Sequence, residues 1–175
     1  MDNPANPLAD LLREKLKDHL EGDVVVAFGD PVVPVTRSSW DVVSRKLKDD
    51  PDLSFDYLRN LTAVDWVTHF EMVYNLYSFK NNHIATFKAK VAREFPVIAS
   101  CAGLWSAADW HEREVYDLFG IEFIGHPDLR RLLLPEDWEG HPLRKDYPIQ
   151  GPLKERPIRW DDLFEKYRKE MKGAV

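Results

Sequence analysis

Histidines and carboxylates gather past the middle of the sequence and are the first candidates for chemistry. His111, Glu112 and Glu114 fall within one short run, and His126 and His141 follow. Residues of these types bind metal ions or transfer protons. A zinc protease helix needs a second His four positions after the first, and the residue at that distance from His111 is valine. The spacing therefore argues against a catalytic metal.

Glu114 and Asp117 stand three positions apart and would share one face of a helix. A pair of carboxylates in this arrangement could transfer protons. Arg113, however, lies four positions from both Asp109 and Asp117, so these three side chains form a stripe of alternating charge. We interpret the stripe as structural, with proton transfer as the alternative hypothesis.

Other kinds of site lack their usual residues. The single cysteine, Cys101, excludes an internal disulfide and a cysteine-rich zinc or iron–sulfur site, and we interpret it as small apolar filler. Gly120, Gly125 and Gly140 are too far apart to cradle a phosphate, so we expect no NAD or ATP site. The 24 Lys and Arg against 30 Asp and Glu give a net charge of −6, which argues against binding to nucleic acid.

No apolar run approaches the roughly 20 residues that span a bilayer. The first residues also lack the basic and apolar regions of a secretory signal. We therefore expect a reducing, cytoplasmic-type compartment, with membrane attachment only through a partner.

A group of residues between positions 130 and 148 is rich in the types that anchor protein interfaces, namely Arg, Trp and Tyr. It contains Arg130, Arg131, Trp138 and the run from Arg144 to Pro148. We interpret this group as a docking surface. The alternative is that the two adjacent arginines pair internally, with Glu136, Asp137 or Glu139.

The elements that must position these residues begin with an α+β region, which we assign to residues 1–104. Leucines at helical spacing predict a helix from about Leu8 to Leu20, and valine-rich runs at 24–28 and 32–35 predict a hairpin. Ser38 and Ser39 are expected to cap a second helix, which ends near residue 49. Strands are predicted at 57–67, 70–79 and 83–91. We expect an antiparallel or mixed sheet with helices packed on one face.

Two further regions follow. Residues 105–148 are predicted to form a helix over 107–119, stopped by Gly120, and then an extended wrapping segment rich in Pro, Gly and His. Residues 149–175 are predicted to be a charged tail with a short C-terminal helix, either solvated or docked on a partner through the apolar stripe that includes Trp160 and Phe164.

The second region resembles the signature of the 30 kDa subunit of respiratory complex I, the NADH:quinone oxidoreductase. The resemblance rests on the runs at 112–121, 126–133 and 135–148, which read EREVYDLFGI, HPDLRRLL and PEDWEGHPLRKDYP. The α+β region ahead of them matches the order of elements in that family.

The resemblance implies a cofactor-free peripheral-arm subunit of a proton-translocating NADH:quinone oxidoreductase, without catalytic activity of its own. Its expected partners are the quinone-site subunit, which helps form the site where quinone binds, and neighbouring iron–sulfur subunits. FMN, iron–sulfur clusters, NADH and quinone would be bound by other subunits. The complex would hold the chain at the cytoplasmic face of the energy-transducing membrane. The alternative is the equivalent subunit of a membrane-bound hydrogenase or of a ferredoxin-dependent relative of complex I.

We therefore predict no catalytic, cofactor or metal residues and a single partner interface. Two rival hypotheses are a free-standing enzyme that uses Glu114, Asp117 and His126, and an assembly module outside any redox complex. The predicted interface residues are Glu112, Arg113, Glu114, Asp117, His126, Arg130, Arg131, Trp138, His141, Arg144, Lys145 and Asp146.

Overall fold

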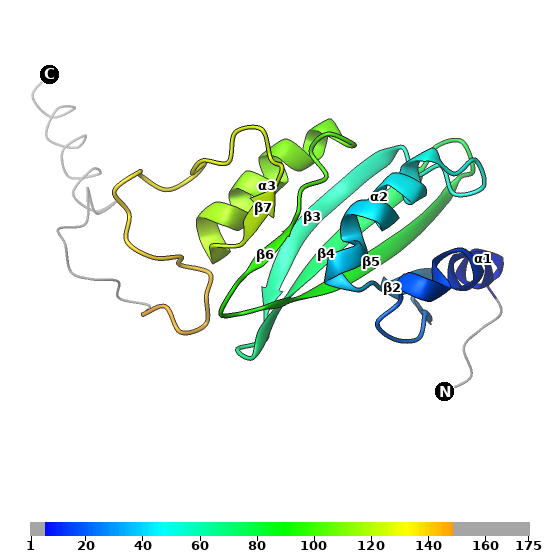
Figure 1. Ribbon diagram of the computed structural model, residues 1–175, viewed down its shortest axis with the longest axis horizontal. Coiled ribbons are helices and arrows are strands. Elements are labelled where there is room, and N and C mark those ends of the chain that lie inside the picture. Colours follow the sequence, from blue (N-terminus) through cyan, green and yellow to red (C-terminus); the bar gives the residue numbers. More distant parts are fainter. Residues whose placement is uncertain (1–5, 149–175) are drawn as a thin grey trace, which may run out of the picture.

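A five-stranded sheet and the helices on it make up most of the chain (Figure 1). The computed structural model describes residues 6–148. In these residues the helices are α1 (Pro7–Leu16), α2 (Trp40–Asp49) and α3 (Ser106–Phe119), with 3₁₀ turns at Lys17–His19 and Arg37–Ser39. The strands are β1 (Val25–Ala27), β2 (Asp30–Pro34), β3 (Tyr57–Asp65), β4 (His69–Ser78), β5 (His83–Ala92), β6 (Val97–Ala99) and β7 (Glu122–Ile124).

The sheet has the strand order β1-β2-β5-β4-β3. β2 and β5 run parallel, whereas the other neighbours are antiparallel, so the predicted α+β fold with a mixed sheet is confirmed. Side chains alternate along β4, where Phe70, Met72, Tyr74 and Leu76 are buried and the residues between them are half-buried. One face of the sheet therefore carries the core.

The helices cover this apolar face, as predicted. From α2, Trp40 stacks on Tyr74 of β4 with ring centroids 3.9 Å apart. From α3, Phe119 meets Phe70 edge to face at 6.3 Å. A single cluster of buried side chains extends from Ala9 to Phe123, so α3 shares its core with the elements before it.

The beginnings of the first two helices differ. Asn6 caps α1, because its side-chain oxygen accepts a hydrogen bond from the Ala9 amide at 3.1 Å. The predicted serine cap of α2 is wrong in detail, since the side chain of Ser39 makes no capping bond. The 3₁₀ turn that ends at Ser39 leads directly into the helix, which leaves its backbone in the helical region.

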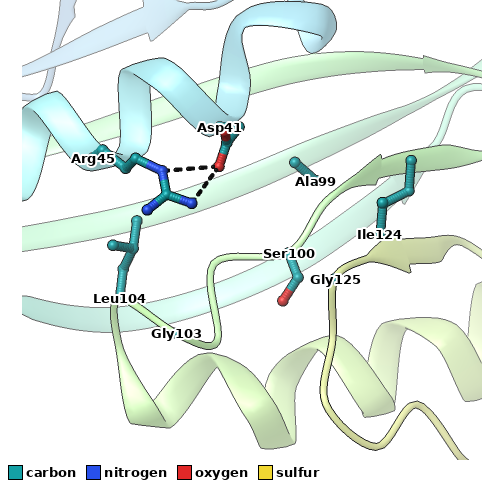
Figure 2. A pocket seen from close by; sticks show the side chains of 8 residues that line it. All are labelled: Asp41, Arg45, Ala99, Ser100, Gly103, Leu104, Ile124 and Gly125. Carbon is teal, nitrogen blue, oxygen red and sulfur yellow. Dashed lines mark hydrogen bonds and ion pairs between the residues drawn. The ribbon is translucent and has the colours of Figure 1, made fainter.

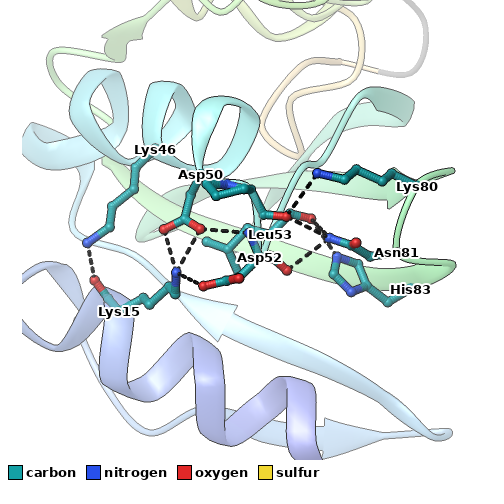
Figure 3. A network of polar contacts seen from close by, with 9 residues as sticks. Lys15, Lys46, Asp50, Asp52, Leu53, Lys80, Asn81 and His83 are labelled. Atoms are coloured by element: carbon teal, nitrogen blue, oxygen red, sulfur yellow. Dashed lines mark hydrogen bonds and ion pairs between the residues drawn. The ribbon is translucent and has the colours of Figure 1, made fainter.

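A polar network joins α1 to the end of α2 and to the β4–β5 turn (Figure 3). The Lys15 ammonium lies between the carboxylates of Asp50 and Asp52, at 2.6 and 2.7 Å. The Asn81 side chain donates to the Asp52 carbonyl at 3.0 Å. These contacts fix the end of the sheet that lies far from the predicted docking residues.

The chain beyond the main sheet forms the predicted wrapping segment. β6 precedes α3 in the sequence and β7 follows it, and the two strands pair to form a small parallel sheet. Residues 125–148 then continue without helix or strand. The predicted C-terminal helix lies outside the described residues. Among residues 6–148, no helix is both long enough and apolar enough to cross a membrane.

Candidate functional site

The wrapping segment completes the C-terminal end of α3. The last carbonyl groups of a helix have no partners within it. In α3, the Asp117 carbonyl accepts a hydrogen bond from His141 Nδ1 at 2.9 Å, and the Phe119 carbonyl accepts one from Arg144 Nε at 2.6 Å. The Leu118 carbonyl accepts from the Leu143 amide at 3.1 Å. Residues 141–144 thus cap the helix from a distance in the sequence.

Asp117 is the centre of this arrangement. Its fully buried carboxylate accepts hydrogen bonds from three consecutive amides, those of residues 132–134, at 2.7–3.0 Å. Its other oxygen pairs with Arg131 at 2.7 Å. Desolvation raises the pKa of Asp117, but these donors outweigh it and hold the pKa below its ordinary value of 3.8. A buried, ionised carboxylate therefore fixes the turn at 131–134.

Arg131 and His141 extend the same cluster. The Arg131 guanidinium also donates to the carbonyls of Trp138 and Gly140, at 2.9 and 3.4 Å. Burial, together with the nearby charges of Arg144 and Arg131, lowers the pKa of His141 from 6.5. Because a carbonyl can only accept, the proton of the neutral ring must sit on Nδ1, facing Asp117.

Gly120 permits this close packing. Its φ of 70° lies in the left-handed region that ends many helices. A Cβ at this position would lie 2.4 Å from His141 Nε2 and 2.7 Å from Arg144 Nη2. Only glycine therefore fits where the wrapping segment crosses the end of α3.

A second anchor ties the end of the segment to the sheet. Asp65, at the end of β3, pairs with Arg93 at 2.5 Å and accepts a hydrogen bond from the Lys145 amide at 2.9 Å. Arg93 also pairs with Asp146 at 2.7 Å. Desolvation opposes ionisation of Asp65, but these donors lower its pKa to about 2. The guanidinium groups of Arg93 and Arg144 both lie over the Phe70 ring.

Glu112 faces inward, toward the loop between β6 and α3. Its fully buried carboxyl group accepts hydrogen bonds from Ser100 Oγ at 2.6 Å and from the Cys101 amide at 2.7 Å. Cys101 Sγ lies 3.2 Å away, and this cysteine is buried, as the filler interpretation predicted. Burial raises the pKa of Glu112 from 4.5 despite these donors. Glu112 therefore holds the loop in place.

The members of the predicted charge stripe along α3 bond to other residues and not to one another. Asp109 contacts His126 at 3.1 Å. Arg113 donates to the carbonyls of Arg130 and Arg131, both at 3.3 Å. The cause is the wrapping segment, which folds back over this face of α3 and supplies partners that compete with those four positions away.

The internal pairs suggested for the adjacent arginines also differ from those observed. Arg131 pairs with Asp117, and Arg130 forms an exposed pair with Asp128 at 2.9 Å.

The described residues contain no group of three or more His, Cys, Asp or Glu side chains that could hold a metal ion.

An open hollow of about 470 Å³ lies between α2, the β6–α3 loop and β7 (Figure 2). Asp41 and Arg45 on its rim pair with each other at 3.1 Å. Ser100, which also lines it, donates its hydroxyl proton to Glu112. The polar side chains around the hollow are thus engaged with other groups of this chain.

The predicted interface residues therefore divide into three groups. Glu112, Asp117 and the side chain of His126 are fully buried, and Arg113 is nearly so. These four residues therefore hold the chain together internally. Arg131, Trp138, His141 and Arg144 are partly buried within the wrapping segment. The exposed members are Glu114, Arg130, Lys145 and Asp146.

Several residues that shape this surface escaped the sequence interpretation. Asp65 and Arg93 anchor the segment across 80 positions of sequence, and no local pattern marks such a contact. Leu133, Leu143 and Trp110 are each more than half exposed. Asp117 did carry a signal, since a carboxylate near the C-terminal end of a helix is unfavourable unless other groups compensate it.

Comparison with known proteins identifies the family. The family model described as "Respiratory-chain NADH dehydrogenase, 30 Kd subunit" matches residues 33–153. A protein of Roseiflexus sp. (strain RS-1), named as a subunit of NADH-quinone oxidoreductase, is 47% identical over 141 residues, which are 79% of this chain and 80% of that protein. The protein of the same name from Roseiflexus castenholzii is 45% identical over 152 residues, 85% of this chain and 86% of that protein.

Solved structures agree with this result. A trypsin-resistant fragment of Nqo5 is 29% identical, with a TM-score of 0.60 over 70% of this chain and 98% of the fragment. A chain of the membrane-bound sulfane sulfur reductase, an archaeal respiratory membrane complex, shares the fold with a TM-score of 0.68 at 22% identity, over 93% of this chain and 92% of that one. The chain therefore belongs to the family of the 30 kDa subunit of respiratory-chain NADH dehydrogenase, which includes these NADH-quinone oxidoreductase subunits.

Proposed function

We propose that this chain is a cofactor-free scaffold in the peripheral arm of a proton-translocating NADH:quinone oxidoreductase. In this proposal it positions the quinone-site subunit and the neighbouring iron–sulfur subunits. FMN, the iron–sulfur clusters, NADH and quinone bind to other subunits. The complex holds the chain at the cytoplasmic face of the membrane.

The observation that carries the proposal is the use of the signature residues. Asp117, Arg131, His141 and Arg144 bond to each other or to the end of α3, so they build a fixed surface. Leu133 and Leu143, by contrast, project from the same segment and are 62% and 52% exposed. Exposed apolar side chains on a rigid support are typical of a protein-binding surface.

The test is purification of the complex from native membranes in mild detergent through a tag on this chain. We expect the quinone-site subunit and iron–sulfur subunits to co-purify with NADH-dependent quinone reduction. Nickel together with iron would instead indicate a hydrogenase. Recovery of the chain without partners would contradict the proposal.

A matched pair of variants locates the surface. Burying a leucine contributes about 1.5–3 kcal/mol, so Leu133→Gln should weaken retention of the partners at least roughly tenfold. Val42→Gln is the control, because Val42 is similarly exposed at 54% but lies on α2. Equal retention by the two variants would place the partner surface elsewhere.

A further inference from the structure

Two polar side-chain atoms lie in the core without a hydrogen-bond partner from the protein. Tyr74 of β4 and Trp40 of α2 are fully buried, and their rings stack on each other. Among residues 6–148, no group forms a hydrogen bond with the Tyr74 hydroxyl or with the Trp40 indole N–H. Buried polar groups of native proteins nearly always have a partner, either a protein group or an ordered water molecule. This layer of the core is therefore where such a partner is expected.

The Tyr74 hydroxyl is the stronger indication of the two. A hydroxyl group can both donate and accept a hydrogen bond, and burying it without either costs free energy. Phenylalanine would fill the same place in the apolar core without that cost. The choice of tyrosine at this position is explained if its hydroxyl group bonds to something.

The Glu112 carboxyl group and the Cys101 side chain lie in the same part of the core. Both residues are fully buried, as Tyr74 is. Burial raises the pKa of the Tyr74 hydroxyl, and the nearby Cys101 and Glu112 raise it further. The three groups thus lie within electrostatic range of one another, yet no direct hydrogen bond joins the hydroxyl to the other two. Polar groups at such a separation can be bridged by a water molecule.

Glu112 can accept one more hydrogen bond. Its Oε1 accepts from the Cys101 amide at 2.7 Å and also lies 3.2 Å from Cys101 Sγ. Its Oε2 accepts from the Ser100 hydroxyl at 2.6 Å. A carboxylate has about four acceptor positions on its two oxygens, so Oε2 retains one.

Solvent comes close to this carboxyl group from outside. Ser100 lines the hollow between α2, the β6–α3 loop and β7 (Figure 2). The hydroxyl of the same residue bonds to Glu112. A single side chain therefore lies between the open hollow and the buried carboxyl group.

We propose that one buried water molecule joins the Tyr74 hydroxyl of β4 to the Glu112 carboxyl group of α3. The water accepts the hydrogen bond that the hydroxyl donates, and it donates one of its own to Oε2. Buried waters typically bond in this way to polar groups that have no other partner. This water ties α3 to the sheet from inside the core, whereas the wrapping segment holds the end of the same helix. The site lies within this chain, so it is independent of the proposed function.

A high-resolution crystal structure of the isolated full chain, or of the purified complex, tests the site directly. We expect an ordered water within about 3 Å of both Tyr74 Oη and Glu112 Oε2. Electron density that leaves Tyr74 Oη surrounded only by carbon atoms would overturn the proposal. A direct bond between the hydroxyl and a protein group would overturn it as well.

Urea unfolding of Tyr74→Phe tests the same site in solution. If the hydroxyl bonds to a water that Glu112 also holds, its removal should lower the folding equilibrium constant about fivefold or more. Tyr57→Phe is the matched control, because Tyr57 is exposed, and it should change that constant about twofold or less. An equally stable or more stable Tyr74→Phe would show that the buried hydroxyl has no partner and would overturn the proposal.

Discussion

Gly120 meets two demands at once, a left-handed backbone and an empty space beside it. Alanine in the left-handed region costs about 1–2 kcal/mol. Its methyl group would also displace His141 and Arg144, whose hydrogen bonds contribute about 1 kcal/mol each. We therefore expect Gly120→Ala to lower the free energy of unfolding by about 3 kcal/mol, measured by urea titration.

Substitutions at two other glycines separate the cost of the left-handed backbone from the cost of the steric conflict. Gly125 has a φ of 85°, and no atom lies within 4 Å of the place that a methyl group would take there, so Gly125→Ala should show the backbone cost alone. Gly103 has neither a positive φ nor a close neighbour, so Gly103→Ala should be nearly neutral. A loss in Gly120→Ala no larger than that in Gly125→Ala would rule out the proposed steric conflict.

The buried carboxyl group of Glu112 should make the stability of the chain depend on pH. Because burial raises its pKa in the folded state above 4.5, its contribution to stability is complete below that pH and is lost as the pH rises through the folded value. Glutamine keeps an acceptor for the Cys101 amide and cannot ionise. Relative to the wild type, Glu112→Gln should gain stability as the pH rises above 4.5, measured by urea unfolding at a series of pH values.

Glu114→Gln is the control for this series. Glu114 lies two positions away on the same helix and is exposed, so Glu114→Gln tests whether the change in the pH profile is specific to the buried position. A difference between Glu112→Gln and wild type that stays constant with pH would show that the Glu112 carboxyl does not titrate in this way.

The wrapping segment depends on Asp117 for its turn at 131–134. Removing one partner of a buried ion pair costs about 3–5 kcal/mol, because the remaining charge is left without compensation. Asp117→Ala would leave the Arg131 guanidinium and three backbone amides without the carboxylate that they bond to. We expect a loss of this size in the free energy of unfolding and faster tryptic cleavage after Arg131.

The exposed pair of Asp128 and Arg130 is the control for Asp117. Pairs in solvent contribute about 0–1 kcal/mol, so Asp128→Ala should alter stability and cleavage little. Because the folded pKa of Asp117 is below 3.8, its contribution is present above that pH and lost as the pH falls through the folded value. The difference in free energy of unfolding between wild type and Asp117→Ala should therefore become smaller in acid. A difference that stays constant with pH would contradict the assignment of Asp117 as a buried, ionised carboxylate.

The helices and hairpins were predictable because their signals are local. Apolar spacing and Gly120 predicted a helix over 107–119, and the structure has Ser106–Phe119. The strands predicted at 70–79 and 83–91 likewise match the β4–β5 hairpin. The parallel pairing of β2 with β5 joins segments about fifty positions apart, as in Val32 with Thr86, and no neighbouring residues mark it.

The site was predictable by position but not by the role of each residue. The sequence predicted a group of Arg, Asp and His side chains in 112–146, and the structure bonds several of them to one another. For Arg113, however, the sequence offered partners four positions away. The actual partners lie 14 to 18 positions along the chain. A segment that folds back on its own helix replaces local pairs with distant ones, and residue types alone cannot reveal that exchange.

Taken together, the exposed apolar side chains leave the isolated chain with surface that a partner would cover. Leu133 and Leu143 on the wrapping segment, and Trp66 and Val67 at the β3–β4 turn, are each more than half exposed. The net charge of −6 opposes self-association at low ionic strength, because like-charged chains repel. Salt screens that repulsion and leaves apolar contacts in place.

We therefore expect the isolated chain to self-associate as its concentration rises, and more strongly at high salt than at low salt. Sedimentation velocity at several concentrations and ionic strengths measures both trends. The double substitution Leu133→Gln and Leu143→Gln should reduce association, whereas Val42→Gln on α2 should not, because Val42 lies away from the wrapping segment. A wild-type chain that stays monomeric at high concentration and high salt would show that these side chains do not form an adhesive surface.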